Sequence, residues 1–187
     1  MSGDDAIVAV IDALEALEIP YMIVGSLSTN LYGIPRSTKD ADFVLQVAPQ
    51  SLFQLAERLG APFRLDPQGS FETVTMTLRH ILKPVGIPFL IELFHLSDDL
   101  YDQERFRRRQ RKQMLNREVS APTAEDVIVN KVRWAAQGRR TKDRDDARDV
   151  IAVQRDRIDW DYVNSWCDRH GSRAVLDEIR ASIPPLL

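Results

Sequence analysis

Two acidic residues stand at the start of a short apolar run and could hold a metal ion. Asp40 and Asp42 are separated by one residue and lead into the run FVL (43–45). Residues two apart on a strand point to the same side, so both carboxylates would face one spot. The two charges would repel each other unless a cation compensates them. Mg²⁺ prefers oxygen ligands of this kind, and substrate phosphates commonly complete its coordination.

A glycine-serine pair precedes these acids and could bind a phosphate group. Gly25-Ser26 follows the apolar run YMIV (21–24), and a short helix is predicted to begin there. A helix N-terminus offers unpaired N–H groups and partial positive charge, glycine permits close approach, and the serine hydroxyl is a further donor. The plain alternative is a simple turn at Gly25-Ser26, with Asp40 capping a turn and Asp42 facing water.

A third acid lies in a later apolar run. Glu92 is the acidic residue of IPFLIELF (87–94). A carboxylate in a central strand is costly unless it has a partner, and a metal shared with Asp40 and Asp42 would supply one. A glutamate on an edge strand that faces water is the alternative, and these residues alone do not decide between the two.

Three charged residues in the C-terminal half form another candidate group. Asp143 and Asp146 are three residues apart, so they share one face of a predicted helix and could orient either Lys131 or a nucleotide. Lys131 could contact a triphosphate, or it could be an ordinary solvated lysine. The two acids could instead pair along their own helix with Arg139, Lys142 or Arg144.

The elements that would position these residues follow from hydrophobic spacing. Apolar periodicity predicts helices over 4–18 and 50–60, strands over 21–24, 40–47, 62–65, 72–80 and 87–96, and helices from 122 onward. This order predicts an α+β fold, in which a mixed β-sheet is flanked by helices and followed by a C-terminal helical region. We expect a core over residues 1–119 with the helical region over 120–187.

Basic residues are concentrated in the middle of the chain. Residues 104–148 hold 14 Lys and Arg against 7 Asp and Glu, although the whole chain has a net charge of −3. The stretch QERFRRRQRKQ (103–113) is predicted to be helical and could follow the backbone of an RNA. The candidate contacts are Arg107, Arg108, Arg109, Arg111 and Lys112. A solvated helix surface is the stronger interpretation for most of them.

Composition narrows the class of protein. The chain has 187 residues, and its single cysteine, Cys167, cannot form an internal disulfide. Apolar runs are shorter than the ~18 residues of a membrane helix. The first residues are acidic, unlike a secretory signal peptide. We therefore expect a cytoplasmic protein without a membrane partner.

The ordered motifs resemble the DNA polymerase beta-like nucleotidyltransferase superfamily, and they are most similar to its AbiEii-type toxin branch. In that branch, GS and D-x-D precede an acid on a later strand, a helical lysine and a K-D-x-x-D motif. The matching positions are Gly25-Ser26, Asp40-Ala41-Asp42, Glu92, Lys131 and Lys142-Asp143-Arg144-Asp145-Asp146. Aspartate is more usual than glutamate at the third acid, and larger toxin members carry more helical material.

The resemblance implies transfer of a nucleoside monophosphate from an NTP to an acceptor hydroxyl, with release of pyrophosphate. It implies two Mg²⁺ ions, with Mn²⁺ as an alternative, held by the catalytic residues Asp40, Asp42 and Glu92. Nucleotide binding is implied for Gly25, Ser26, Thr38, Lys131, Asp143 and Asp146. The acceptor would be an RNA such as tRNA, a protein or a small molecule, and an antitoxin partner would follow from a toxin–antitoxin role. The alternative is an inactive nucleotide- or RNA-binding regulator with the same fold.

Overall fold

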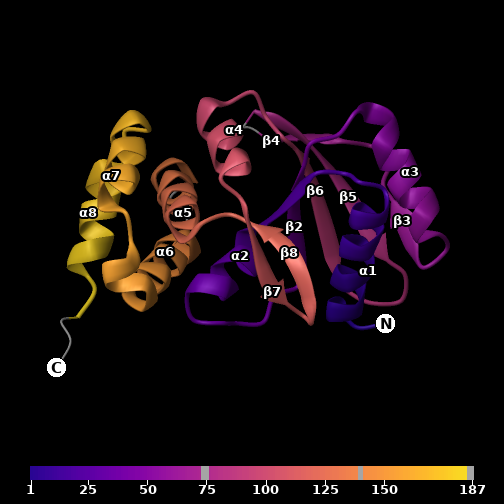
Figure 1. The fold of residues 1–187 in the computed structure, drawn as a ribbon, viewed down its shortest axis with the longest axis horizontal. Coiled ribbons are helices and arrows are strands. Elements are labelled where there is room, and N and C mark those ends of the chain that lie inside the picture. Colours follow the sequence, from indigo (N-terminus) through magenta and orange to yellow (C-terminus); the bar gives the residue numbers. More distant parts are fainter. Residues whose placement is uncertain (73–75, 139–140, 185–187) are drawn as a thin grey trace. The chain divides into compact units, whose positions relative to one another are not determined.

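The chain divides into two units, which are described separately here (Figure 1). The computed structural model describes residues 1–72, 76–138 and 141–184. The first unit comprises Met1–Leu27 and Ser37–Pro122 and is called the sheet unit. The second comprises Ser28–Arg36 and Thr123–Leu187 and is called the helical unit. Helix α2 (Gly25–Tyr32) begins in the sheet unit and ends in the helical unit.

The sheet unit is built on a mixed six-stranded sheet with the order β1-β2-β6-β5-β3, in which β4 also pairs with β5. The strands are β1 (Tyr21–Val24), β2 (Asp40–Leu45), β3 (Phe63–Leu65), β4 (Ser70–Glu72), β5 (Thr77–Pro84) and β6 (Leu90–His95). The pair β2–β6 is parallel, whereas the other four pairs are antiparallel. The predicted mixed sheet flanked by helices is therefore confirmed.

The two faces of this sheet differ in character. One face carries fully buried Phe43 and Leu45 on β2 and Ile91 and Leu93 on β6. Helices α1 (Gly3–Ala16) and α3 (Pro49–Leu59) contact each other and add further buried apolar side chains to this core. Because side chains alternate along a strand, Asp42 and Glu92 belong to the opposite face. The carboxylates are thus kept out of the main core.

Helix α4 (Leu100–Arg107) packs on the same face as the carboxylates. Its Phe106 joins a buried cluster with Met22, Val24 and Val44, against which Phe94 and Leu96 also pack. Val44 lies two residues beyond Asp42 on β2, so this cluster adjoins the carboxylates along the strand. The face therefore has an acidic part at the start of β2 and an apolar part covered by α4.

The prediction of a continuous basic helix was wrong. Only its first part is helical, as α4, and the chain then forms a hairpin of β7 (Gln110–Met114) and β8 (Arg117–Ala121). Leu115 and Asn116 connect the strands, and both have positive φ, at 51° and 57°. Such two-residue turns match the twist of a hairpin. Fully buried Val119 and Ala121 fix β8, which contacts β1.

The predicted strand over 72–80 differs from the structure at its start. Residues 73–75 lie outside the described residues, and Met76 occupies a turn with φ 54°. The strand β5 instead begins at Thr77 and extends to Pro84. The remaining strand and helix predictions of the sheet unit agree with the structure to within a few residues.

The helical unit contains the end of α2 and four further α-helices. They are α5 (Ala124–Gly138), α6 (Thr141–Gln154), α7 (Trp160–Arg169) and α8 (Arg173–Ala181). Thr123 caps α5: its hydroxyl accepts from the Asp126 backbone N–H at 3.2 Å and donates to the Asp126 carboxylate at 2.8 Å. The predicted C-terminal helical region is confirmed. Within the described part of the chain, no helix has the length and apolar character needed to cross a membrane.

Candidate active site

Asp40 and Asp42 lie on one face of the sheet, as their spacing predicted. Asp40 is the first residue of β2, and both acids are half-buried, whereas Ala41 and Phe43 between and beyond them are buried on the other face. Asp42 stands opposite Val24 of antiparallel β1 and opposite Glu92 of parallel β6. Two neighbouring strands therefore fix the direction in which the carboxylate of Asp42 points.

Gly25 of the glycine-serine pair lies in close contact with Asp42 of the aspartate pair. It follows β1 directly and has φ +60°, a backbone conformation that favours glycine. A Cβ added at Gly25 would lie 1.8 Å from Oδ2 and 2.8 Å from Cγ of Asp42. Only a residue without a side chain can therefore occupy this position. Helix α2 begins at Gly25, and buried Ser26 follows it, so a helix N-terminus adjoins the Asp42 carboxylate.

Thr38 orients the carboxylate of Asp40. Its Oγ1 donates a hydrogen bond to Oδ1 of Asp40 at 2.5 Å and accepts from the Asp40 backbone N–H at 3.4 Å. The resemblance implied that Thr38 binds nucleotide. In the structure its hydroxyl orients Asp40 as a neutral donor, so the carboxylate keeps its negative charge, and nucleotide binding by Thr38 stays a prediction.

Glu92 faces the same side as Asp42 but carries an ion pair. Its Oε2 lies 3.2 Å from Nη1 of Arg79 on β5, and Nε of Arg79 donates to Oγ of Ser70 at 3.0 Å. Among the described residues, no group of three His, Cys, Asp or Glu side chains is placed to hold a metal. Sequence reasoning missed Arg79, although the alternation of ETVTMTLRH places it on one side of a strand.

The donor set of this face fits Mg²⁺. Asp40 and Asp42 supply two hard oxygen ligands, and magnesium sites commonly consist of one or two carboxylates completed by substrate phosphates and water. The glycine that leaves room beside Asp42, and the helix N-terminus that begins there, suit a phosphate group at the same place.

In the helical unit, Lys131 is a buried cation with two carboxylate partners. Its Nζ lies 2.9 Å from Oδ1 of Asp143 and 2.7 Å from Oδ2 of Asp146. All three side chains are at most 8% exposed. The expected sharing of one helix face by the two acids is confirmed, and they meet Lys131 from the neighbouring helix α5. The alternative of a solvated lysine does not hold.

Arg36 completes this cluster from the segment that follows α2. Its Nη2 lies 3.3 Å from both carboxylate oxygens of Asp146. Asn30 fixes the backbone of Arg36, because its Oδ1 accepts from the Arg36 N–H at 3.1 Å and its Nδ2 donates to the Arg36 carbonyl at 2.8 Å. The two positive charges of Lys131 and Arg36 thus balance the two negative charges of the carboxylates.

Asp146 is kept ionised by this arrangement. Burial alone would raise the pKa of its carboxyl, but Lys131 and Arg36 together hold the pKa below its usual value. A buried charge is stable only when it is paired. The ion pairs of Asp146 with Lys131 and Arg36 therefore hold α6 to α5 and to the segment before Ser37.

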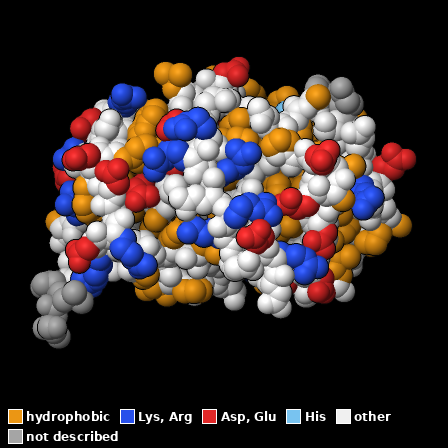
Figure 2. Space-filling view, viewed as in Figure 1, with side chains coloured by type: hydrophobic (Ala, Val, Ile, Leu, Met, Phe, Trp, Pro, Cys, Tyr) orange, Lys and Arg blue, Asp and Glu red, His pale blue; other side chains and the backbone are white. Residues whose placement is uncertain are grey.

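Most of the basic stretch is neutralised within the sheet unit. Figure 2 shows Lys and Arg side chains over α4 and the β7–β8 hairpin with Asp and Glu side chains among them. Over residues 105–117, four arginines form ion pairs of 2.7–2.9 Å: Arg105 with Asp102, Arg107 with Glu104, Arg111 with Glu15 and Arg117 with Asp12. A broad RNA-tracking surface therefore receives little support from these residues.

Several solved structures share the architecture of this chain. No sequence profile of a known protein family matches the chain, and no curated protein matches its sequence. A solution structure of the antibiotic-resistance factor ANT(2″)-Ia matches with TM-score 0.65 and 13% identity, over 95% of this chain and 96% of that one. A crystal structure of ANT(2″)-Ia in complex with adenylyl-2″-tobramycin gives 0.60 and 15%, over 91% and 98%.

A third solved structure also has a similar fold. An antigenic nucleotidyltransferase-like protein from Paracoccidioides brasiliensis matches with TM-score 0.52 and 20% identity, over 96% of this chain and 93% of that one. At these identities the likeness concerns the fold. The chain therefore has the nucleotidyltransferase fold, with a mixed sheet followed by C-terminal helices.

Proposed function

We propose that this protein is a Mg²⁺-dependent nucleotidyltransferase that moves a nucleoside monophosphate from an NTP to an acceptor hydroxyl. The observation that carries the proposal is the contact between Gly25 and Asp42, which sets a helix N-terminus beside a carboxylate on the face that also holds Asp40. N–H groups that could bind a phosphate therefore lie next to carboxylates that could bind a metal. The shared fold of solved nucleotidyltransferases supports the same reaction class.

Each residue of the face has a role in this proposal. Asp40 and Asp42 hold the metal, and the Gly25-Ser26 N–H groups and the Ser26 hydroxyl bind phosphate oxygens of the NTP. Bound Mg²⁺, as one ion or two, would neutralise charge that develops on the phosphate groups, and Mn²⁺ could take its place. Thr38 keeps Asp40 in position through its hydrogen bond.

The reaction forms one bond and breaks another. The acceptor oxygen bonds to the α-phosphorus, the bond from that phosphorus to the bridging oxygen breaks, and pyrophosphate leaves. Glu92 is the third carboxylate of this face and stands in register with Asp42, so we assign it the acceptor proton and a share in the metal site. To do this, its carboxylate must exchange Arg79 for the acceptor or the metal.

The acceptor and the biological setting remain open within this proposal. One solved structure of the same fold contains an adenylylated aminoglycoside, so a small polyhydroxylated acceptor is a candidate beside RNA and protein. Membership of a toxin–antitoxin pair and a nucleotide contact by Lys131, Asp143 and Asp146 are further hypotheses, which derive from the motif resemblance.

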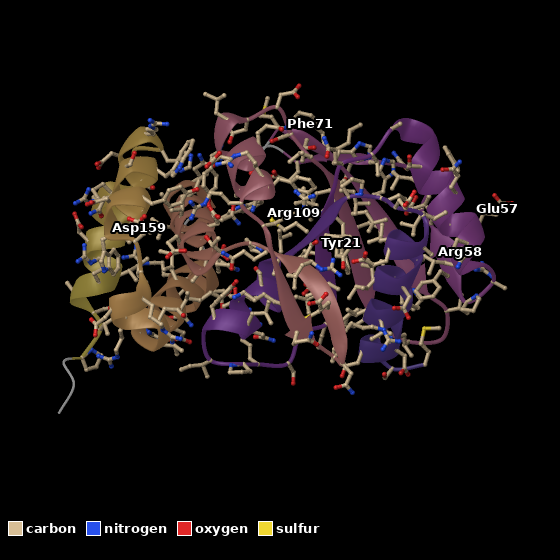
Figure 3. The ribbon with its side chains drawn as sticks, viewed as in Figure 1. Tyr21, Glu57, Arg58, Phe71, Arg109 and Asp159 are labelled. Carbon is tan, nitrogen blue, oxygen red and sulfur yellow. The ribbon has the colours of Figure 1, made fainter. Side chains whose placement is uncertain are left out.

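The test is transfer from α-³²P-labelled NTPs to tRNA, total protein and aminoglycosides, with pyrophosphate release measured in parallel. Asp42→Asn should lower the rate at least about a hundredfold, because a metal site contributes several kcal/mol of charge stabilisation. Glu92→Gln should lower the rate with less effect on Mn²⁺ binding, measured by electron paramagnetic resonance. Glu57→Gln, which removes an exposed acid of α3 (Figure 3), is the matched control and should keep full activity.

The Glu92–Arg79 ion pair favours a second function, an inactive nucleotide- or RNA-binding regulator, because it satisfies Glu92 without a metal. NTP binding to the wild type, detected by thermal shift, with no pyrophosphate release for any acceptor would favour the regulator. Full activity of Asp42→Asn would exclude the metal site as proposed.

A further inference from the structure

A cavity beside α4 contains an arginine, Arg109, to which the described residues supply no counter-ion. The cavity has a volume of about 400 Å³, and its walls include Gln46, Leu96, Leu100, Phe106 and Arg109. Gln46 and Leu96 directly follow the parallel strands β2 and β6. Arg109 follows α4 closely in the chain and is labelled in Figure 3. All these residues belong to the sheet unit.

Arg109 is held in place by stacking and by one hydrogen bond. Its Cζ lies 4.1 Å from the ring centroid of Phe106, which is only 4% exposed, and its Nη1 donates to the Phe106 carbonyl at 2.6 Å. A guanidinium that stacks on an aromatic ring is preorganised and keeps its remaining N–H groups in one plane. The position of the charge is therefore fixed before any ligand arrives.

The charge of Arg109 is not balanced by a carboxylate of the described chain, unlike the charges of its neighbours. Glu104 also lines the cavity, but both of its oxygens accept from Arg107, at 2.9 and 2.7 Å. Burial lowers the pKa of Arg109, which reflects the cost of desolvating its charge. A partly desolvated cation without a counter-ion is typical of a site for an anion.

The cavity lies on the same face of the sheet as the metal-binding carboxylates. Asp42 and Val44 point toward that face from β2, Gln46 directly follows the strand, and Val44 packs in the cluster that contains Phe106. Four residues of strand correspond to about 13 Å. A ligand in the cavity would therefore be near the reaction centre and outside the NTP phosphate site.

We propose that this cavity binds a nucleotide unit of the acceptor, whose phosphate pairs with Arg109 and whose base packs on the apolar wall of Leu96, Leu100 and Phe106. A volume of about 400 Å³ lies within the range of small-molecule sites. A cation beside an apolar surface matches a phosphate beside a planar base. This inference rests on the proposed function in that the ligand is identified as the acceptor. Its source is either a free nucleotide or an RNA segment.

The test is the binding of a fluorescein-labelled RNA hexamer, measured by fluorescence anisotropy without NTP or metal. Arg109→Gln should weaken binding about tenfold and reduce the salt dependence by about one phosphate contact. Arg58→Gln removes the same charge from an exposed arginine of α3 that does not line the cavity (Figure 3), and it should change binding less than twofold. Displacement of the hexamer by AMP would identify a single-nucleotide site, and its absence would identify an RNA segment.

A second pair of variants separates binding from folding. Leu100 is 79% exposed at the rim, so Leu100→Glu should fold normally and weaken hexamer binding by repulsion and by loss of apolar contact. Leu100→Gln loses only the apolar contact and should weaken binding less. Equal effects of Arg109→Gln and Arg58→Gln, or no hexamer binding by the wild type, would overturn the inference. The assay needs no catalysis, so Arg109-dependent binding without any nucleotidyl transfer would refute the proposed function alone.

Discussion

Two acid pairs of similar spacing have opposite surroundings in the two units. In the helical unit, Asp143 and Asp146 are buried, and Lys131 and Arg36 supply two positive charges to them. In the sheet unit, Asp40 and Asp42 are half-buried, Asp40 is held by the neutral hydroxyl of Thr38, and Asp42 packs against the backbone at Gly25.

Under the proposed function, this difference separates carboxylates that stabilise the fold from carboxylates that bind a ligand. A buried acid that contributes to folding needs its own cation, because an uncompensated buried charge is very costly. An acid that holds a metal needs orientation without neutralisation, and a hydroxyl donor and a glycine backbone provide this. We therefore expect changes in the sheet unit to affect activity, and changes in the helical cluster to affect stability.

The largest effect is expected for Gly25→Ala. The new Cβ would lie 1.8 Å from Oδ2 of Asp42, so the carboxylate must move, and the positive φ adds strain of about 1–2 kcal/mol. Nucleotidyl transfer should fall at least about a hundredfold, since displacement of a metal ligand removes several kcal/mol of stabilisation. Labelled transfer and Mn²⁺ binding measure the loss.

Gly60→Ala is the matched control for that substitution. Gly60 has a similar φ of +66°, but an added Cβ would meet no atom within 4 Å. Its cost should be limited to backbone strain, visible in thermal unfolding, with transfer unchanged. If Gly25→Ala and Gly60→Ala kept the same activity, the close contact with Asp42 would have no role in the reaction.

The next effect concerns the helical cluster. Lys131→Met leaves the Asp143 and Asp146 carboxylates buried with only Arg36 to balance them, so unfolding should be easier by about 3–5 kcal/mol. Trp134, Trp160 and Trp166 all belong to the helical unit, so tryptophan fluorescence during urea unfolding reports on that unit.

Lys142→Met removes an exposed lysine near the same acids and should change stability by less than about 0.5 kcal/mol. A Lys131→Met protein with wild-type stability but no nucleotide binding would show that the helical cluster binds a ligand rather than stabilising the fold. It would make Lys131 a ligand-binding residue, as the motif resemblance implies.

The sequence predicted the positions of the local features better than their contacts. The alternation around Asp40 and Asp42, the start of a helix at Gly25 and the shared face of Asp143 and Asp146 depend on short-range patterns, which are visible in the sequence. The contacts of Arg79 with Glu92 and of Arg36 with Asp146 join residues 13 and 110 positions apart. Only the strand register and the helix packing determine such pairs.

The hairpin of β7 and β8 shows why the basic stretch was misassigned. Arginine, glutamine and lysine favour a helix, and they dominate residues 103–113. Pairing with β8, whose Val119 and Ala121 are fully buried, outweighs that preference. The polar residues of β7 gave no alternating apolar signal, so tertiary packing rather than local propensity decides this segment.

The smallest effect is expected for Arg36→Gln, and it should depend on pH. Arg36 helps to hold the pKa of Asp146 below its ordinary value of about 3.8. The contribution of Arg36 is therefore fully present above about pH 4 and declines as pH falls through the lowered pKa. Because Arg36 is 35% exposed, we expect a loss of only about 1 kcal/mol at pH 7. Urea unfolding followed by tryptophan fluorescence from pH 7 to pH 3 should show wild type and variant converging in acid.

Arg148→Gln, which removes a partly exposed arginine of α6, should cost less than about 0.5 kcal/mol at neutral pH. A difference between wild type and Arg36→Gln that persists unchanged at pH 3 would mean that Arg36 stabilises the unit by packing rather than through the charge of Asp146.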